Sequence, residues 1–82
     1  MPISGVVIMT QPEKTENVLA LLNQKDDVTT YGVHKDYHII AVLEADSSRR
    51  LEEMTKEIQQ EMPGVLGIFP AYVNFENEVN ET

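Results

Sequence analysis

Few side chains in this sequence could do chemistry, and their spacing offers little support for it. His34 and His38 flank a predicted turn and could lie close together, but no third metal ligand stands near them. Asp26 and Asp27 fall in a predicted loop, where solvated turn residues are expected rather than general acids. The sequence has no cysteine, which excludes disulfides, thiolate metal sites and cysteine nucleophiles. It also has no glycine-rich phosphate loop and no Ser–His–Asp arrangement. Neither an enzyme nor a cofactor is therefore predicted.

The dipeptide Arg49-Arg50 looks superficially like a twin-arginine export signal. Such signals stand at the N-terminus before an apolar segment, whereas this pair stands mid-chain before the charged segment 51–60. We therefore expect exposed arginines that pair with Glu53 or Asp46. No signal peptide is predicted, and no segment reaches the ~18 apolar residues of a transmembrane helix. A soluble protein that stays where it is made is expected.

The composition indicates one small acidic domain. The chain has 82 residues, of which 41% are hydrophobic. A domain of this size buries only about 60% of its unfolded surface, which allows one thin core and no deep pocket. The net charge of −8 disfavours binding to nucleic acid phosphates. It provides solubility, or attraction for a basic partner.

The apolar pattern predicts four strands and two helices. The strands are expected at residues 3–9, 28–34, 37–45 and 65–75, where β-branched residues are frequent or apolar residues alternate. The helices are expected at about 11–24 and 47–61, where apolar residues recur at helical spacing. Thr10 and Glu13 form a capping-box pattern at the start of the first helix. Lys35-Asp36 suits a two-residue hairpin turn.

The resulting order, β-α-β-β-α-β, predicts the split βαβ, ferredoxin-like α+β fold. Right-handed crossovers place both helices on one face of a four-stranded antiparallel sheet. The expected spatial order is fourth, first, third and second strand. One domain is expected over residues 1–76, with a flexible acidic tail at 77–82.

The other face of this sheet carries no helix, and its predicted side chains are mainly apolar. With Glu44 taken as exposed, the period of two along the strands assigns residues to this open face. They are Gly5, Val7, Met9, His38, Ile40, Val42, Phe69, Ala71 and Val73. Leu66, Ile68 and Tyr72 are expected inside, and Pro70 indicates an edge position or a bulge. An uncovered apolar strip usually marks an interface. It could also be a homodimer face, or reflect central strands that are apolar on both sides.

Three short segments together resemble the NapD family: ISGVV at 3–7, VLEA at 42–45 and PGVL at 63–66, the last followed by Tyr72. The resemblance covers about residues 3–76. It implies a cytoplasmic chaperone without enzymatic activity or cofactor. The implied partner is the twin-arginine signal peptide of the periplasmic nitrate reductase catalytic subunit. Binding would delay export until that enzyme has received its molybdenum cofactor.

The family's binding surface is associated with the sheet, which matches the open face. The predicted peptide-binding residues are Val7, Met9, Ile40, Val42, Glu44, Phe69, Ala71 and Val73. Glu44 and the tail residues Glu76, Glu78 and Glu81 are expected to meet the peptide arginines. The chain is expected to be a monomer or a weak homodimer that does not insert into membranes.

Two other functions stay open at this point. One is an amino-acid-sensing regulatory domain of the same fold, a side-by-side dimer with glycine-lined ligand loops, for which Gly5 and Gly32 are poor matches. The other is a ferredoxin-like dimeric monooxygenase. It needs a cavity between sheet and helices with a placed histidine, and this chain is short for that.

Overall fold

Strands and helices follow one another in the predicted order. The computed structural model describes residues 2–74, with side chains up to residue 71. The elements are β1 (Ile3–Thr10), the 3-10 turn η1 (Pro12–Lys14), α1 (Thr15–Asn23), β2 (Val28–His34), β3 (His38–Glu44), α2 (Ser48–Glu61) and β4 (Val65–Asn74). The predicted tail at 77–82 lies outside the described residues. None of the helices in the described part is long and apolar enough to cross a bilayer.

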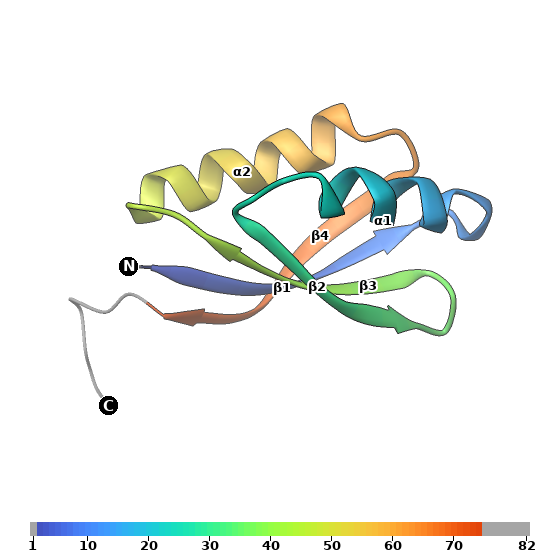
Figure 1. The fold of residues 1–82 in the computed structure, drawn as a ribbon, viewed down its shortest axis with the longest axis horizontal. Coiled ribbons are helices and arrows are strands. Elements are labelled where there is room, and N and C mark those ends of the chain that lie inside the picture. The colour runs from blue at the N-terminus through green and yellow to red at the C-terminus, as the bar shows by residue number, and fades with distance from the viewer. Residues whose placement is uncertain (1, 75–82) are drawn as a thin grey trace.

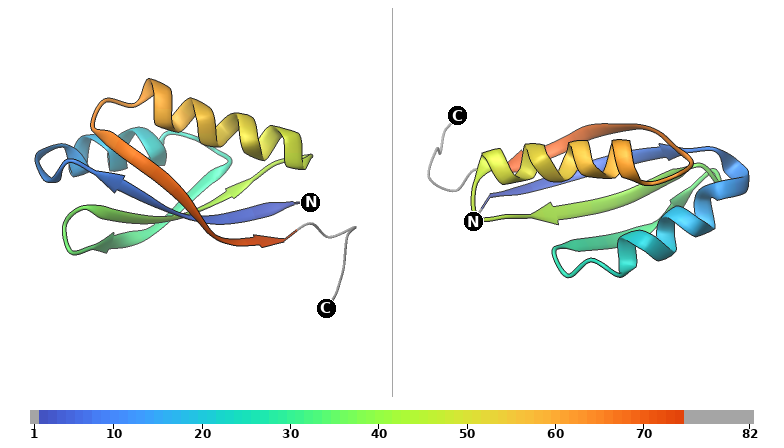
Figure 2. Two further views of the ribbon diagram at one scale, coloured as in Figure 1. Left: turned by 180° about the vertical axis from the view of Figure 1, so that it is seen from behind. Right: turned by 90° about the horizontal axis from the view of Figure 1, so that it is seen from above.

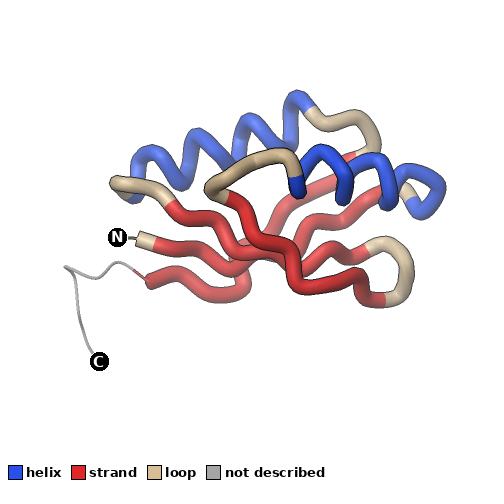
Figure 3. Tube along the Cα trace, viewed as in Figure 1, coloured by secondary structure: helices blue, strands red, loops and turns tan. Residues whose placement is uncertain are grey.

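The four strands form one antiparallel sheet in the order β2-β3-β1-β4. Both helices lie on one face of this sheet, and the opposite face carries no helix (Figures 1 and 3). α1 lies beside β2 and α2 beside β4, so the two helices cover different halves of the same face (Figure 2). The predicted strand order and ferredoxin-like α+β fold are confirmed.

A single core fills the space between the helices and the sheet. In the central strands the predicted alternation is confirmed, because Val6 and Ile8 of β1 are buried together with Ile39 of β3. The strand register places Ile39, Ile8 and Ile68 side by side across β3, β1 and β4. Burial of one such side chain stabilises the fold by about 1.5–3 kcal/mol. α2 packs onto the sheet with a stripe of apolar residues: Leu51, Met54, Ile58 and Met62.

The beginning of α1 differs from the prediction. The capping box is wrong: the N-cap of η1 is Gln11, and no side chain caps it. Thr10 ends β1 on the core side of the strand and is 1% exposed. Its Oγ1 lies 2.6 Å from Thr15 Oγ1, and the Thr15 hydroxyl lies 2.7 Å from the carbonyl oxygen of Asp36. The alternation along β1 therefore decides where Thr10 points, and its hydroxyl joins a buried pair.

The hairpin between β2 and β3 turns at Lys35 and Asp36, as predicted. Both residues have positive φ, 55° and 67°, as in the type I′ turns that match the twist of paired strands. Two hydrogen bonds hold this turn close to the end of β1 and the start of α1. The Thr15 hydroxyl donates to the Asp36 carbonyl oxygen, and the backbone N–H of Thr10 donates to the Tyr37 carbonyl oxygen at 2.9 Å.

β4 is an edge strand with two irregularities, one on each side of Pro70. Between Met9 and Thr10 of β1 the register shifts, and Leu66 of β4 has no paired residue. Leu66 is 58% exposed, so its predicted inside position is wrong. The second shift leaves Ala71 unpaired. Each bulge inserts one residue and reverses the alternation that follows it.

The second bulge affects the predicted faces of the last residues. Beyond it, the backbone of Tyr72 is paired with Gly5 and that of Val73 with Ser4. The strict period of two that placed Val73 with Phe69 is therefore interrupted in the backbone. The side chains of Tyr72 and Val73 lie outside the described part of the structure.

Candidate functional site

The open face of the sheet brings together residues from three of its four strands, β3, β1 and β4. Across its middle, Val7 is paired with Ile40 on one side and with Phe69 on the other. One row further, Val42 lies opposite Gly5. On the other side of the middle row, Met9 lies opposite His38 and Gly67. The strand pairing therefore assembles five predicted residues into one strip: Val7, Met9, Ile40, Val42 and Phe69.

The strip is open to solvent. Phe69 is 52% exposed and Ile40 38% exposed, and Val7, Met9 and Val42 are half-buried. No helix lies over this face (Figure 1). Large apolar side chains gathered on an uncovered sheet face are the usual sign of an interaction surface.

Gly67 gives the Phe69 ring its position, and sequence reasoning missed this. A Cβ atom at Gly67 would lie 2.9 Å from Cζ of Phe69, so the ring packs over the glycine two residues earlier in the same strand. Gly67 is buried as a result. The missing side chain lets the ring lie along the strip beside Met9, the residue paired with Gly67. The sequence signal that could have indicated this packing is a glycine two residues before a phenylalanine on the same strand.

The two ends of the open face differ in charge. At one end Glu44 is exposed and opposes Ile3. The chain segments that flank this end add the exposed Asp27 and Asp46, and the backbone N–H of Glu44 donates to the Asp27 carbonyl oxygen at 3.0 Å. This end can therefore attract a cation. The other end carries His38.

The histidines lie together at the hairpin end of the sheet, as expected. His34 and His38 are paired across the strands, with ring centroids 6.3 Å apart. Tyr37 packs against His38 at 4.2 Å between centroids. Among the described residues, no group of three or more histidine or acidic side chains could hold a metal ion. The pair serves as an aromatic border of the strip.

Arg50 is tied to its own helix. Its Nη1 lies 2.9 Å from Glu57 Oε2 and 3.3 Å from Glu53 Oε1. The hydrogen bond to Glu57, followed by that to Glu53, raises the pKa of the Arg50 guanidinium above its ordinary value. The predicted pairing with Glu53 is confirmed, and Glu57 is a second partner. These bonds lie at the surface, between side chains that are 38–54% exposed, and contribute little to stability.

The remaining predicted site residues have mixed outcomes. Ala71 is exposed but occupies the bulge position without a strand partner. Val73 and the tail acids lie outside the described side chains. Gly5 and Gly32, considered above for ligand loops, both lie within strands. Gly32 has φ +122° and stands where the β2 register shifts, so a bulge accounts for it.

Comparison with known proteins gives a family and several similar structures. The family model described as NapD protein matches residues 1–77. The solution structure of the E. coli Tat proofreading chaperone protein NapD is 21% identical with a TM-score of 0.76, covering 98% of this chain and 84% of that chain. The crystal structure of the hypothetical protein PHS023 from Pyrococcus horikoshii is 21% identical with a TM-score of 0.77, covering 92% of this chain and 90% of that chain. These two structures share the fold. No curated protein matches the sequence.

Proposed function

The chain belongs to the NapD protein family, and on that premise we propose that it is a cytoplasmic chaperone without catalytic activity. Its ligand is the twin-arginine signal peptide of the periplasmic nitrate reductase catalytic subunit. Binding keeps the precursor from export until that subunit has folded around its cofactor. The observation that carries the proposal is the uncovered apolar strip with a carboxylate at one end.

The dimensions of the strip suit one helix. Adjacent strands lie about 4.8 Å apart, so β3, β1 and β4 together span about 10 Å, close to the 10–12 Å width of a helix with its side chains. An apolar or amphipathic helix docks into such a surface through anchors on one face. Ile40, Val7 and Phe69 would contact it across the width, and Val42 and Met9 along its length.

The charge of the protein supports the same partner. A twin-arginine signal peptide is basic at its front and apolar behind, and the net charge of this chain is −8. Glu44 lies at one end of the strip, where a guanidinium can form a charge-assisted hydrogen bond. The predicted peptide position therefore has its basic front at the Glu44 end of the open face and its apolar segment along the strip towards His38.

Titration of the purified protein with the signal peptide of its cognate nitrate reductase tests the proposal. We expect saturable binding in a one-to-one ratio. A peptide with lysines in place of both arginines should bind about tenfold more weakly, because lysine cannot form the bidentate contact of arginine with a carboxylate. Added salt should weaken binding of both peptides.

The controls separate recognition from nonspecific attraction. A scrambled peptide of the same composition carries the same charge and should bind far more weakly than the native peptide. Absence of saturable binding to the native peptide contradicts the proposal. Equal affinity for the native and scrambled peptides would reduce it to a general attraction between an acidic protein and a basic peptide.

A further inference from the structure

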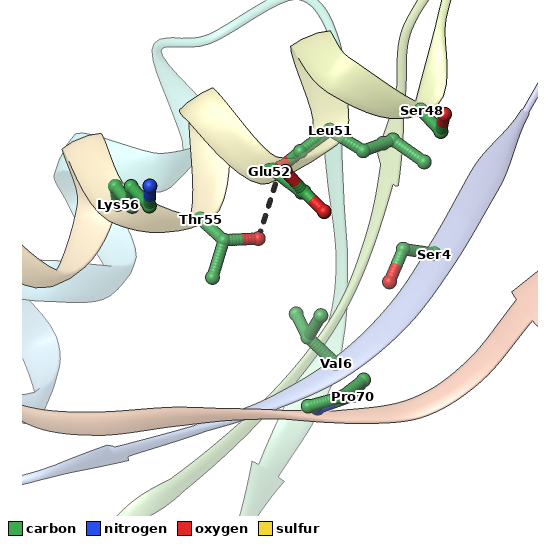
Figure 4. Close-up of a pocket in the computed structure, with 8 residues that line it drawn as sticks. All are labelled: Ser4, Val6, Ser48, Leu51, Glu52, Thr55, Lys56 and Pro70. Carbon is green, nitrogen blue, oxygen red and sulfur yellow. Dashed lines mark hydrogen bonds between the residues drawn. The ribbon is translucent and has the colours of Figure 1, made fainter.

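A groove lies on the helix side of the sheet, between α2 and the strands β1 and β4 (Figure 4). Its volume is about 350 Å³, which is in the lower part of the range for ligand sites. Its walls are mostly apolar, from Val6, Leu51 and Pro70. The lining is completed by Ser4, Ser48, Glu52, Thr55 and Lys56.

Among the residues whose side chains the structure describes, one buried polar side chain of this groove has no hydrogen-bond partner. Ser4 is 6% exposed, and its side chain enters the groove from β1 (Figure 4). Among the residues whose side chains are described, none forms a hydrogen bond with the Ser4 hydroxyl. A buried polar group without a hydrogen bond costs about 1–3 kcal/mol, so a ligand that provides one would be favoured here.

The polar groups at the Ser4 end are all oxygens. They are the hydroxyls of Ser4 and Ser48 and the carboxylate of Glu52. The Thr55 hydroxyl is already used, since it donates to the Leu51 carbonyl oxygen at 3.0 Å (Figure 4). A carboxylate and two hydroxyls suit a cation with several N–H donors, and the apolar walls suit an aliphatic stem.

Several nearby positive charges oppose a cation, and their positions limit their effect. Arg49 and Arg50 follow Ser48 on α2 but do not line the groove, and Arg50 is bonded to Glu53 and Glu57. Lys56 lies at the other end of the groove from Ser4 and Ser48 (Figure 4). α2 begins at Ser48, and the positive end of a helix dipole acts only within the first turn. Glu52 carries a full charge and lies beyond that turn.

We propose that this groove receives one arginine side chain of the same signal peptide, an inference that rests on the proposed function. The stem lies against Val6, Leu51 and Pro70, and the guanidinium donates to Glu52 and Ser4. The peptide thus uses both faces of the sheet: its apolar segment covers the open face, and its basic front turns around the β4 edge.

The route around the edge is short. Phe69 of the open strip and Pro70 of the groove are consecutive residues of β4, which is an edge strand. Pro70 has no backbone N–H, so β4 cannot bind a further strand through hydrogen bonds at that point. Two or three residues of extended peptide, at about 3.4 Å each, would pass from one face to the other here.

A double-mutant cycle tests this contact. Glu52→Gln is combined with peptides in which each arginine is singly replaced by glutamine, and affinities are measured by calorimetry. We expect Glu52→Gln to weaken the native peptide about tenfold. The same substitution should not change the affinity for the peptide that lacks the arginine bound in the groove. Glu61→Gln is the matched control, because it removes the same charge from the same helix outside the groove.

Ser4→Ala separates binding from folding. Because the hydroxyl has no partner among the described side chains, this variant should unfold at the same urea concentration as the wild type or higher, yet bind the native peptide less tightly. Two results would overturn the groove assignment. One is that Glu52→Gln and Glu61→Gln weaken peptide binding equally. The other is that peptide affinity is unchanged in both Glu52→Gln and Ser4→Ala. If the wild type binds the native peptide in those cases, the proposed function stands without the groove. If the wild type does not bind, the proposed function itself is wrong.

Discussion

Val42→Glu is expected to abolish measurable peptide binding while the domain stays folded. Val42 is half-buried on the open face, with Gly5 opposite on β1 and Thr29 opposite on β2. A carboxylate here can remain hydrated in the free protein, but an apolar helix on the strip would remove that water. Burial of an unpaired charge costs several kcal/mol, which corresponds to about a hundredfold or more in affinity.

Gln59→Glu is the matched control for this substitution. Gln59 is exposed on α2, on the helix side of the sheet and outside the residues that line the groove. It adds the same charge to the protein without changing the strip. Calorimetric titration should show wild-type affinity for Gln59→Glu and none for Val42→Glu. Wild-type affinity of Val42→Glu for the peptide would mean that the open face is not the binding surface.

Two adjacent residues of β3 should give opposite results when substituted. Ile39 is 0% exposed, whereas Ile40 is 38% exposed on the open face. Ile39→Ala leaves a cavity at the β3 end of the row of Ile39, Ile8 and Ile68 and should lower the free energy of unfolding by about 2–5 kcal/mol. A domain of 82 residues has a total stability of about 4–12 kcal/mol, so this loss would remove a large share of the stability.

Ile40→Ser should change the free energy of unfolding by only about 1 kcal/mol and weaken peptide binding instead. Urea unfolding and peptide titration on both variants measure the two effects separately. A large loss of stability in Ile40→Ser, with wild-type affinity, would mean that Ile40 belongs to the folding core and not to a binding surface.

The central strands could be predicted from the sequence because nothing interrupts their alternation. β1 and β3 each have a neighbouring strand on both sides and contain no proline. Each residue of β3 that was assigned to one face lies on that face. The family resemblance, drawn from hydrophobic segments on these strands and on β4, is also confirmed. Both results depend on local patterns that tertiary contacts do not override.

β4 could not be predicted in the same way. Pro70 indicated an irregularity, but the unpaired residues are Leu66 and Ala71, and their positions depend on how β4 matches β1. The predicted capping role of Thr10 is wrong for a related reason. Its sequence context fits a helix cap, whereas its burial on β1 determines its hydrogen bonds. Such choices depend on the partner strand, which the local sequence does not contain.

The groove beside α2 could not be predicted either. Ser4 and Glu52 are far apart in the sequence, and only the packing of α2 over the sheet brings them to the same groove. In the sequence, Ser4 is one small residue in an apolar strand and Glu52 one of several acids on a helix. Their connection becomes visible only when burial and direction are known.

The most direct test of sheet-face binding is an NMR titration of the isotopically labelled protein with its cognate signal peptide. The account predicts that the largest amide and methyl shift changes fall on five residues of the open face: Val7, Met9, Ile40, Val42 and Phe69. Buried neighbours such as Ile8 and Ile39 should change less, and the outer face of α1 should not change. Saturable binding with its largest changes on the outer surfaces of the helices, and none on the open face, would contradict the account.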